Sequence, residues 1–190
     1  MSLVRPVPPH YDEIYPPDAV CDGVRRVAAE ITPWAAHLLG KTGQQVLAVC
    51  ILRGAIFFFA DVLQAVPVSI EATFCRCRGY LPNVNGGLAD QVRVEWFEAD
   101  FNGRYVLLLD DICDTGRTLA HMRQFCLERG AVEVRAAVLV HRVLENAVFS
   151  PDFAAFRHSG KEWLAGYGME DSSWRMNYPA IYRLLGSGEK

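Results

Sequence analysis

The sequence predicts an α/β fold with a mainly parallel central sheet flanked by helices. The segments 45–52 and 105–110 are almost continuously apolar and rich in Val, Ile and Leu, which is typical of strands buried on both faces of a parallel sheet. A further strand is expected at 132–141. Segments with helical character lie between these strands, and this alternation indicates a parallel sheet with right-handed crossovers.

Length and composition restrict the class of protein. The chain has 190 residues, which suits one domain with a proper core, and its formal net charge is −3. The acidic balance argues against a nucleic-acid binder. With no run of 18 apolar residues, no membrane span is expected. We expect residues 1–17 to be an extended, loosely held Pro-rich arm without the apolar core of a signal peptide, and residues 18–190 to form a single domain.

The six cysteines predict no metal site. Cys75 and Cys77 form a CxC pair, but no second Cys or His cluster supplies the remaining ligands. We interpret all six as structural or spectator thiols in a reducing compartment, which favours a cytoplasmic location.

The first half of the chain should contain two N-terminal helices before the first strand. Residues 18–31 carry an apolar stripe behind Asp18 as N-cap. A second short helix is expected with Thr32 as cap and Pro33 at its first position, ending at Gly40. The elements expected next are a very apolar helix at 56–64, a strand at 68–76, a loop at 79–90 and an antiparallel or edge strand at 92–98.

The second half continues the alternation. A helix is expected at 118–130, with Gly130 at its C-terminal stop. It leads into the strand at 132–141, and short C-terminal strands are expected at 163–168 and 180–185.

Residues 107–118, LLLDDICDTGRT, form the strongest candidate site. Asp110 and Asp111 follow an apolar strand, whose carboxyl end is where open α/β sheets bind ligands, and can bind hydroxyls or Mg²⁺. Gly116 and two threonines lead into a helix N-terminus, which favours an anion. Asp114 lies beside this cradle and can reach a proton on a reacting group. The signatures of P-loop and dinucleotide-binding proteins are absent. The DDxxD pattern of isoprenoid synthases lacks its helix and second acidic motif, and a solvated acidic turn explains the composition poorly.

Three segments then resemble one known family. Residues 106–119, VLLLDDICDTGRTL, resemble the phosphoribosyl-pyrophosphate motif of the type I phosphoribosyltransferases. Residues 52–63, LRGAIFFFADVL, resemble the pyrophosphate loop and following helix of the hypoxanthine-guanine phosphoribosyltransferases, and residues 163–181 resemble their purine-binding segment. The similarity runs in matching order from about residue 14 to residue 185. It implies the type I phosphoribosyltransferase fold with a small hood from both termini, and a homodimer or homotetramer.

The resemblance also implies an activity and residue roles. The activity is Mg²⁺-dependent transfer of phosphoribose from phosphoribosyl pyrophosphate to a 6-oxopurine, giving IMP or GMP and pyrophosphate. Asp114 would be the general base, while Asp110 and Asp111 would bind the ribose hydroxyls directly or through Mg²⁺. The other implied roles are 5′-phosphate binding by Thr115, Gly116, Arg117 and Thr118; pyrophosphate binding by Arg53, Gly54 and Arg175, with a cis Leu52–Arg53 peptide; closure of the loop at 78–89, which carries Tyr80; base stacking by Trp163; contact of the Leu164 backbone with the base edge; and binding of a second Mg²⁺ by Glu170.

The sequence departs from the family pattern where the base is recognised. His141 stands where the family has the Lys that contacts the 6-oxo group, and a neutral His can donate or accept a hydrogen bond. Xanthine, adenine or another base therefore stays open as acceptor. Arg142 could substitute only through a bulge, because adjacent strand residues face opposite sides. The family's Ser is replaced by Gly79, its Phe or Tyr by Trp163, and Arg175 is one position out of register.

A second hypothesis is a regulatory protein on the same scaffold that senses phosphoribosyl pyrophosphate or a nucleotide. The acidic pI of about 5.9 and the lack of a helix-turn-helix extension count against it. Asp114 favours the enzyme, because a sensor has no use for a base at that position.

Overall fold

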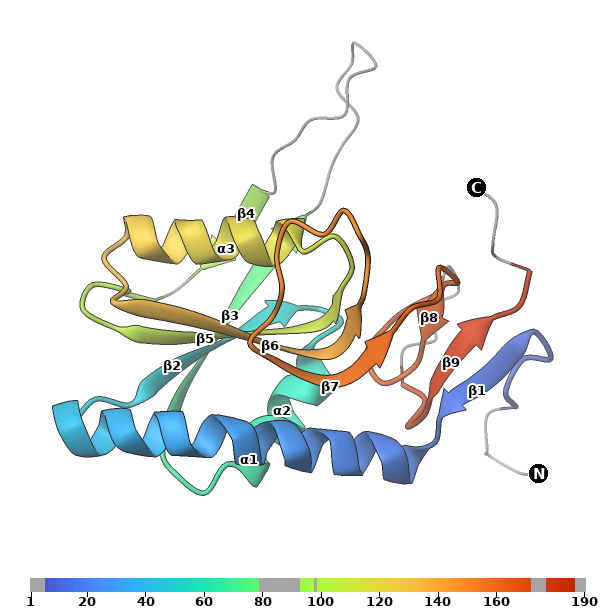
Figure 1. Cartoon of the computed structure of the whole chain (residues 1–190), viewed down its shortest axis with the longest axis horizontal. Helices are drawn as coiled ribbons and strands as arrows, with labels where there is room; N and C mark the ends of the chain where they lie inside the picture. Colours follow the sequence, from blue (N-terminus) through green and yellow to red (C-terminus); the bar gives the residue numbers. More distant parts are fainter. Residues whose placement is uncertain (1–5, 79–92, 98, 172–176, 187–190) are drawn as a thin grey trace, which may run out of the picture.

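The computed structural model describes residues 6–78, 93–97, 99–171 and 177–186. Its centre is a six-stranded sheet in the order β4-β3-β2-β5-β6-β7, and only the edge strand β4 is antiparallel to its neighbour. Helices α1 and α2 cover one face and α3 covers the other (Figure 1). The elements of this layer are α1 (Pro17–Thr42), β2 (Val46–Leu52), α2 (Ile56–Ala65), β3 (Ile70–Arg78), β4 (Arg93–Phe97), β5 (Tyr105–Cys113), α3 (Arg117–Glu128), β6 (Glu133–Arg142) and β7 (Phe153–His158).

Side-chain alternation along the parallel strands builds two cores. Ala48 and Cys50 of β2 face α1 and α2, whereas Leu47 and Val49 pack on the α3 side. In β5, Leu107 and Leu109 face the first core, and Val106 and Leu108 the second. Because both faces are covered, these strands need apolar residues at every position, which is the pattern that predicted them.

The N-terminal helix corrects one prediction. Residues 17–42 form a single helix with Pro33 inside it, instead of two helices separated at Thr32. The Thr32 hydroxyl donates to the Ala28 carbonyl at 2.7 Å and therefore caps nothing. The helix ends at Gly43 rather than Gly40. The interior proline costs about 3 kcal/mol, but a buried stripe continues past it, and the packing of Ile31, Trp34 and Leu38 on the sheet offsets that cost.

Two strand boundaries differ from expectation. Strand β5 runs through Asp110 and Asp111 to Cys113, because its parallel pairing with β6 continues as far as Cys113 opposite His141. The acidic pair therefore lies within the strand. Strand β7, which pairs in parallel with β6, was not predicted. The expected strands at 45–52, 68–76, 92–98 and 132–141 are confirmed to within a few residues.

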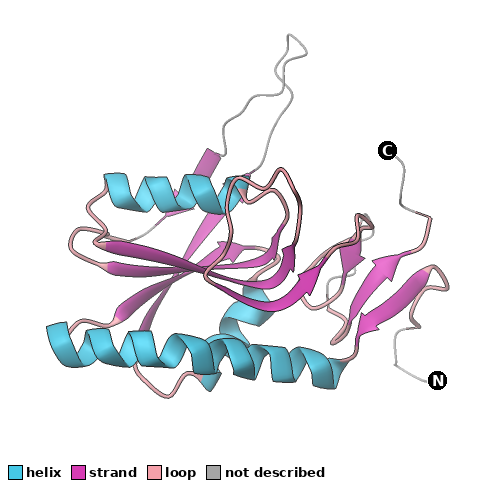
Figure 2. Cartoon of the chain, viewed as in Figure 1, coloured by secondary structure: helices cyan, strands magenta, loops and turns pink. Residues whose placement is uncertain are grey.

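A small second sheet stands beside the carboxyl ends of the main strands (Figure 2). It contains β1 (Tyr11–Tyr15), β9 (Ile181–Leu184) and β8 (Leu164–Ala165), paired antiparallel in that order. The rings of Tyr11, Tyr178 and Tyr182 form its core. The expectation of a loosely held arm is therefore wrong for β1. Both ends of the chain contribute to this sheet, as the resemblance implied for a hood, and we use that name for β1, β8 and β9.

Candidate active site

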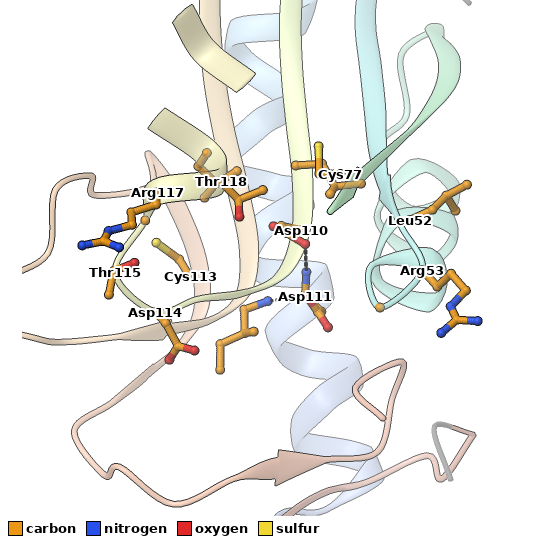
Figure 3. Close-up of a pocket in the computed structure, with 15 residues that line it drawn as sticks. Leu52, Arg53, Cys77, Asp110, Asp111, Cys113, Asp114, Thr115, Arg117 and Thr118 are labelled. Atoms are coloured by element: carbon orange, nitrogen blue, oxygen red, sulfur yellow. Dashed lines mark hydrogen bonds between the residues drawn. The ribbon is translucent and has the colours of Figure 1, made fainter. Parts of the chain in front are cut away.

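Three pockets meet at the carboxyl ends of the parallel strands. The strand-end pocket, of about 490 Å³, is lined by residues 51–54 at and just after the end of β2, by Cys77 and by residues 110–119 (Figure 3). The arginine pocket, of about 240 Å³, is lined by Leu52, Arg53, Gly54, Arg76, Cys77, Asp111, Gly168 and Glu170. The tryptophan pocket, also of about 240 Å³, is lined by Asp111, Ile112, Asp114, Arg142, Trp163, Leu164, Met169 and Glu170. Asp111 borders all three, so any ligands in them would be neighbours.

The loop between β5 and α3 is suited to an anion. Helix α3 begins at Arg117 and has no side-chain cap, and a helix N-terminus of this kind favours an anion. Gly116 has φ 77°, and a Cβ there would lie 2.6 Å from the Phe149 Cβ, so this position requires glycine. The Val148 amide donates to the Thr115 carbonyl at 2.8 Å and holds the loop from behind. Thr115, Arg117 and Thr118 border the strand-end pocket around this turn.

The acidic pair is held in an environment that calls for a cation. Asp110 is buried, and its Oδ1 accepts the Asp111 amide at 3.0 Å (dashed in Figure 3). The Asp111 Oδ1 accepts the Ile112 amide at 2.9 Å. Burial and the neighbouring Asp111 charge raise the pKa of Asp110 well above its ordinary value. Burial also raises the pKa of Asp111. A bound cation would relieve both effects.

The loop after β2 packs directly on this pair. The Leu52–Arg53 peptide is cis, as the resemblance implied. A Cβ on Gly54 would clash with the Asp111 carboxylate, meeting its Oδ2 first and lying 2.5 Å from its Cγ, so any larger residue would displace Asp111 or the loop. Arg53 pairs with Glu170 of the hood side at 2.9 Å, and the Tyr167 hydroxyl donates to Asp61 of α2. These contacts hold the turn after β8 over the loop.

Asp114 and Arg142 form an ion pair at the edge of the tryptophan pocket. The Arg142 Nε donates to Asp114 Oδ1, and the same guanidinium donates to the carbonyls of Gly160 and Glu162. Asp114 is about half exposed and borders both the strand-end and the tryptophan pocket. Trp163, 58% exposed, is not a core residue, and its indole N–H donates to the Glu170 carbonyl at 3.1 Å.

His141, which was predicted to contact the base, does not line the candidate site. It is 6% exposed, borders none of these three pockets, and its Nδ1 has no hydrogen-bond partner among the described residues. Burial lowers the pKa of His141. The residue at the pocket is Arg142. The pairing of β6 with β5 and β7 runs through His141 without a register shift, so Arg142 reaches the pocket without the bulge that we expected such a role to require.

Most of the residues predicted to form the site come together. The strand-end pocket contains Arg53, Gly54, Asp110, Asp111, Asp114, Thr115, Gly116, Arg117 and Thr118. Trp163, Leu164 and Glu170 join Asp111 and Asp114 at the tryptophan pocket. Tyr80 and Arg175 lie outside the described residues. Sequence reasoning missed Arg76 and Cys77, although both lie at the carboxyl end of a parallel strand, where ligand-binding residues are expected.

The donor set fits Mg²⁺ better than a metal that needs a complete protein cage. Within the residues the structure describes, no three His, Cys, Asp or Glu side chains gather in a way that could hold an ion. Mg²⁺ usually takes one or two carboxylates and completes its shell with water and substrate phosphates. Asp110 and Asp111 supply such a pair beside the anion-binding loop.

An open α/β sheet with an anion cradle and a buried acidic pair at its strand ends defines a protein that binds a phosphorylated ligand, with a separate pocket beside it. Comparison with known proteins specifies this class. The chain belongs to the phosphoribosyl transferase domain family, whose model matches residues 10–152.

Named relatives and solved structures agree with that family. A hypoxanthine-guanine phosphoribosyltransferase of Streptococcus pneumoniae is 29% identical over 168 residues, covering 86% of this chain and 87% of its own. One from Aquifex aeolicus is 27% identical over 140 residues, covering 73% and 78%. The crystal structure of a Staphylococcus aureus hypoxanthine phosphoribosyltransferase superposes with a TM-score of 0.79 at 18% identity, covering 91% of this chain and 90% of that one.

A Trypanosoma cruzi hypoxanthine phosphoribosyltransferase, a point mutant complexed with the product IMP, also gives a TM-score of 0.79, at 21% identity and coverage of 96% and 95%. The predicted fold, family and enzyme class are thus confirmed.

No helix among the described residues is long and apolar enough to cross a membrane.

Proposed function

We propose that the protein acts in purine salvage, transferring phosphoribose from phosphoribosyl pyrophosphate to a 6-oxopurine, hypoxanthine or guanine, with Mg²⁺ as cofactor. The observation that carries the proposal is that Asp111 and Asp114 border the strand-end pocket and the tryptophan pocket at once. A phosphosugar in the first would therefore meet a base in the second. The names of the curated relatives favour the same acceptors.

The donor would occupy the strand-end and arginine pockets. The amides and hydroxyls of residues 115–118 would hold the 5′-phosphate at the start of α3. Arg53 and Gly54 would hold the pyrophosphate, and Arg175 and Tyr80 keep the pyrophosphate and loop roles that the resemblance implies. Asp110 and Asp111 would hold Mg²⁺, which would offset the negative charge of the pyrophosphate when bound. A metal role for Glu170 requires that it exchange its ion pair with Arg53.

The acceptor would lie in the tryptophan pocket. Trp163 would stack on the base, and the Leu164 backbone would meet the base edge. The bond from the anomeric carbon to the pyrophosphate oxygen breaks, a new bond forms from that carbon to a ring nitrogen, and the proton displaced from the base passes to the Asp114 carboxylate. Pyrophosphate leaves with the electron pair of the broken bond, so stabilisation of its charge is the main requirement.

The test is nucleotide formation. The protein is mixed with phosphoribosyl pyrophosphate, Mg²⁺ and, in turn, hypoxanthine, guanine, xanthine, adenine or uracil, and products are read by mass. A 6-oxopurine nucleotide whose formation falls at least about 100-fold in Asp114→Asn supports the proposal. Binding of phosphoribosyl pyrophosphate with no reaction of any base would overturn it in favour of a sensor.

We further propose a homodimer or homotetramer in the cytoplasm. Ile56, Phe57 and Phe74 are large apolar side chains on α2 and β3 that stay more than a third exposed in the single chain. All six cysteines are free, which suits a reducing compartment. Light scattering of the wild type and of Phe57→Glu tests the assembly: a monomeric wild type would refute it.

A further inference from the structure

The turn after β8 has a backbone conformation that is unusual for its sequence. The Gly166 amide donates to the Met169 carbonyl at 2.9 Å and the Met169 amide to the Gly166 carbonyl at 3.0 Å, so these residues close a two-residue hairpin. Its central residues, Tyr167 and Gly168, have φ of 46° and 104°, the left-handed combination that favours Asn-Gly. A bulky side chain rarely has positive φ, and such residues cluster at functional sites. Contacts of the tyrosine side chain must therefore offset the cost of this conformation.

The Tyr167 side chain ties the turn to helix α2. Its hydroxyl donates to the Asp61 carboxylate. Its ring packs against the core and lies 6.1 Å, centroid to centroid, from the ring of Phe57. Burial and the hydrogen bond to Asp61 raise the pKa of Tyr167, so the hydroxyl keeps its proton near neutral pH. Neither Tyr167 nor Asp61 borders the strand-end, arginine or tryptophan pocket.

The turn lies directly on the loop after β2. A Cβ on Gly168 would clash with the Gly54 carbonyl, lying 3.0 Å from its carbon, just as a Cβ on Gly54 would clash with the Asp111 carboxylate. The turn, the loop and Asp111 are therefore stacked without a side chain between the two backbones. Leu164 and Met169, which flank the turn, line the tryptophan pocket. The position of the turn thus sets how close the wall of the base pocket stands to the loop that would hold pyrophosphate.

A second contact joins the same two segments, but it is made by residues of the site. Arg53 pairs with Glu170 at 2.9 Å, and both line the arginine pocket. Their proposed roles with pyrophosphate and Mg²⁺ require that this ion pair be exchanged for ligands. The bond between Tyr167 and Asp61 involves no residue with a proposed ligand, so it is the tie that can persist while the donor is bound.

We propose that Tyr167 is a positioning residue, which through Asp61 holds the wall of the base pocket against the loop after β2 during the reaction and so keeps water from the anomeric carbon. The inference rests on the proposed function, because it assumes a base in the tryptophan pocket. A base held at the correct distance captures that carbon, whereas a wall that moves away admits water. Water then forms the new bond to the carbon and loses a proton to solvent, and the products are ribose 5-phosphate and pyrophosphate.

The experiment measures how each variant divides phosphoribosyl pyrophosphate between nucleotide and ribose 5-phosphate. Mg²⁺ and the 6-oxopurine that the wild type uses are saturating, and uncatalysed hydrolysis is subtracted. This product ratio does not depend on the fraction of enzyme that is folded. Tyr167→Phe keeps the ring and removes the hydroxyl. It should raise the share of ribose 5-phosphate and lower kcat by about tenfold, the value of one hydrogen bond, while KM for phosphoribosyl pyrophosphate stays within about threefold of the wild-type value.

Variants of the partner residue test the same bond. Asp61→Asn keeps an oxygen that can accept the tyrosine proton, so its product ratio should stay close to that of the wild type. Asp61→Leu should reproduce Tyr167→Phe, and the double variant should be no worse than either single variant, because both changes remove one shared bond. Tyr105→Phe is the matched control. It removes a tyrosine hydroxyl at the opposite end of β5 and should keep the wild-type ratio.

The outcomes separate this inference from the proposed function. A wild-type product ratio in Tyr167→Phe, even with a lower melting temperature, would show that the bond only stabilises the fold and would overturn the inference. Additive effects in the double variant would overturn it as well, while nucleotide formation by the wild type stands. A wild type that forms no 6-oxopurine nucleotide would overturn the proposed function and this inference with it.

Discussion

Replacing Gly54 with alanine should disable the site by moving a single carboxylate. The added methyl carbon would lie 2.5 Å from the Asp111 Cγ. Carbon atoms in contact settle at about 3.5–4.0 Å, so Asp111 or the loop must yield by roughly 1 Å. Because Asp111 borders all three pockets, that displacement alters the phosphosugar, pyrophosphate and base positions together.

The expected magnitudes follow from this overlap. Overpacking of this kind costs about 1–3 kcal/mol of folding free energy. A misplacement of about 1 Å in a catalytic constellation can lower the rate by about 100-fold. The Asp111 carboxylate would also strain the 2.9 Å bond that it accepts from the Ile112 amide. We therefore expect Gly54→Ala to lower kcat/KM by about 100-fold and to weaken phosphoribosyl pyrophosphate measurably.

Gly40→Ala is the matched control. Gly40 is an exposed residue of α1, and a Cβ there would meet nothing within 4 Å. This variant should keep full activity and gain about 0.5–1 kcal/mol of stability. Both variants are assayed by nucleotide formation, by calorimetric titration with phosphoribosyl pyrophosphate, and by thermal unfolding. Wild-type kcat/KM in Gly54→Ala would refute the claim that the loop and Asp111 are packed without room for a methyl group.

Three further predictions test the charges and the base pocket. Burial and the Asp111 charge raise the pKa of Asp110 above its unfolded value, so the unfolded state loses its proton first and this carboxyl subtracts stability as pH rises through that interval. Asp110→Asn should therefore be more stable than the wild type at neutral pH without metal, by about 1–3 kcal/mol, and the difference should vanish in acid. Urea unfolding midpoints of both proteins, measured as a function of pH, test this prediction. A variant less stable than the wild type at neutral pH would contradict it. Trp163→Ala should raise KM for the base by about 5- to 100-fold, with the melting temperature nearly unchanged because the ring is 58% exposed; a loss confined to phosphoribosyl pyrophosphate binding would place the base elsewhere. EDTA should abolish turnover and excess Mg²⁺ should restore it, since Asp110 and Asp111 would otherwise face the donor's phosphates as like charges; turnover that persists in EDTA would remove the metal from the proposal.

Most strands of the central sheet could be predicted from sequence, because a strand buried on both faces is a continuous run of apolar residues. That signal does not set where a strand stops. Strand β5 continues through two aspartates because its partner β6 still offers hydrogen bonds opposite Ile112 and Cys113. This pairing is a property of two distant segments, so no local pattern records it. The same reason explains why β7, which exists only by pairing with β6, was missed.

In the N-terminal helix, by contrast, a strong local signal led to a wrong prediction. Pro33 is a strong local signal for a helix start, and Thr32 before it is a good cap. The apolar stripe of α1, however, keeps its phase across the proline, from Val27 and Ile31 to Leu38. Packing of that stripe on the sheet outweighs the local preference. A stripe that stays in phase is therefore better evidence for one helix than a proline is for two.

At the site, the residues that belong to the motif could be predicted from sequence, whereas those that line the pockets outside the motif could not. Asp110, Asp111 and Asp114 stand in a pattern whose chemistry can be read directly. Arg142 was expected to reach the site only through a bulge, yet it lines the tryptophan pocket while β6 keeps its register with β5 and β7. Arg76 and Cys77 have no motif and reach the pockets only through the position of β3 in the sheet.

The acidic pair explains why local rules and function conflict at this edge of the sheet. A buried strand end would be more stable with apolar residues at 110 and 111, since burial opposes the charge of both carboxyls. A bound ligand can offset the free-energy cost of burying these two charges, because a ligand that binds only the folded chain adds its binding free energy to stability. A cation held by the carboxylates would supply that contribution when an anionic donor binds beside it. The destabilised carboxyls and the α3 terminus beside them are therefore expected to act as two halves of one site, in which a cation at the first would strengthen anion binding at the second.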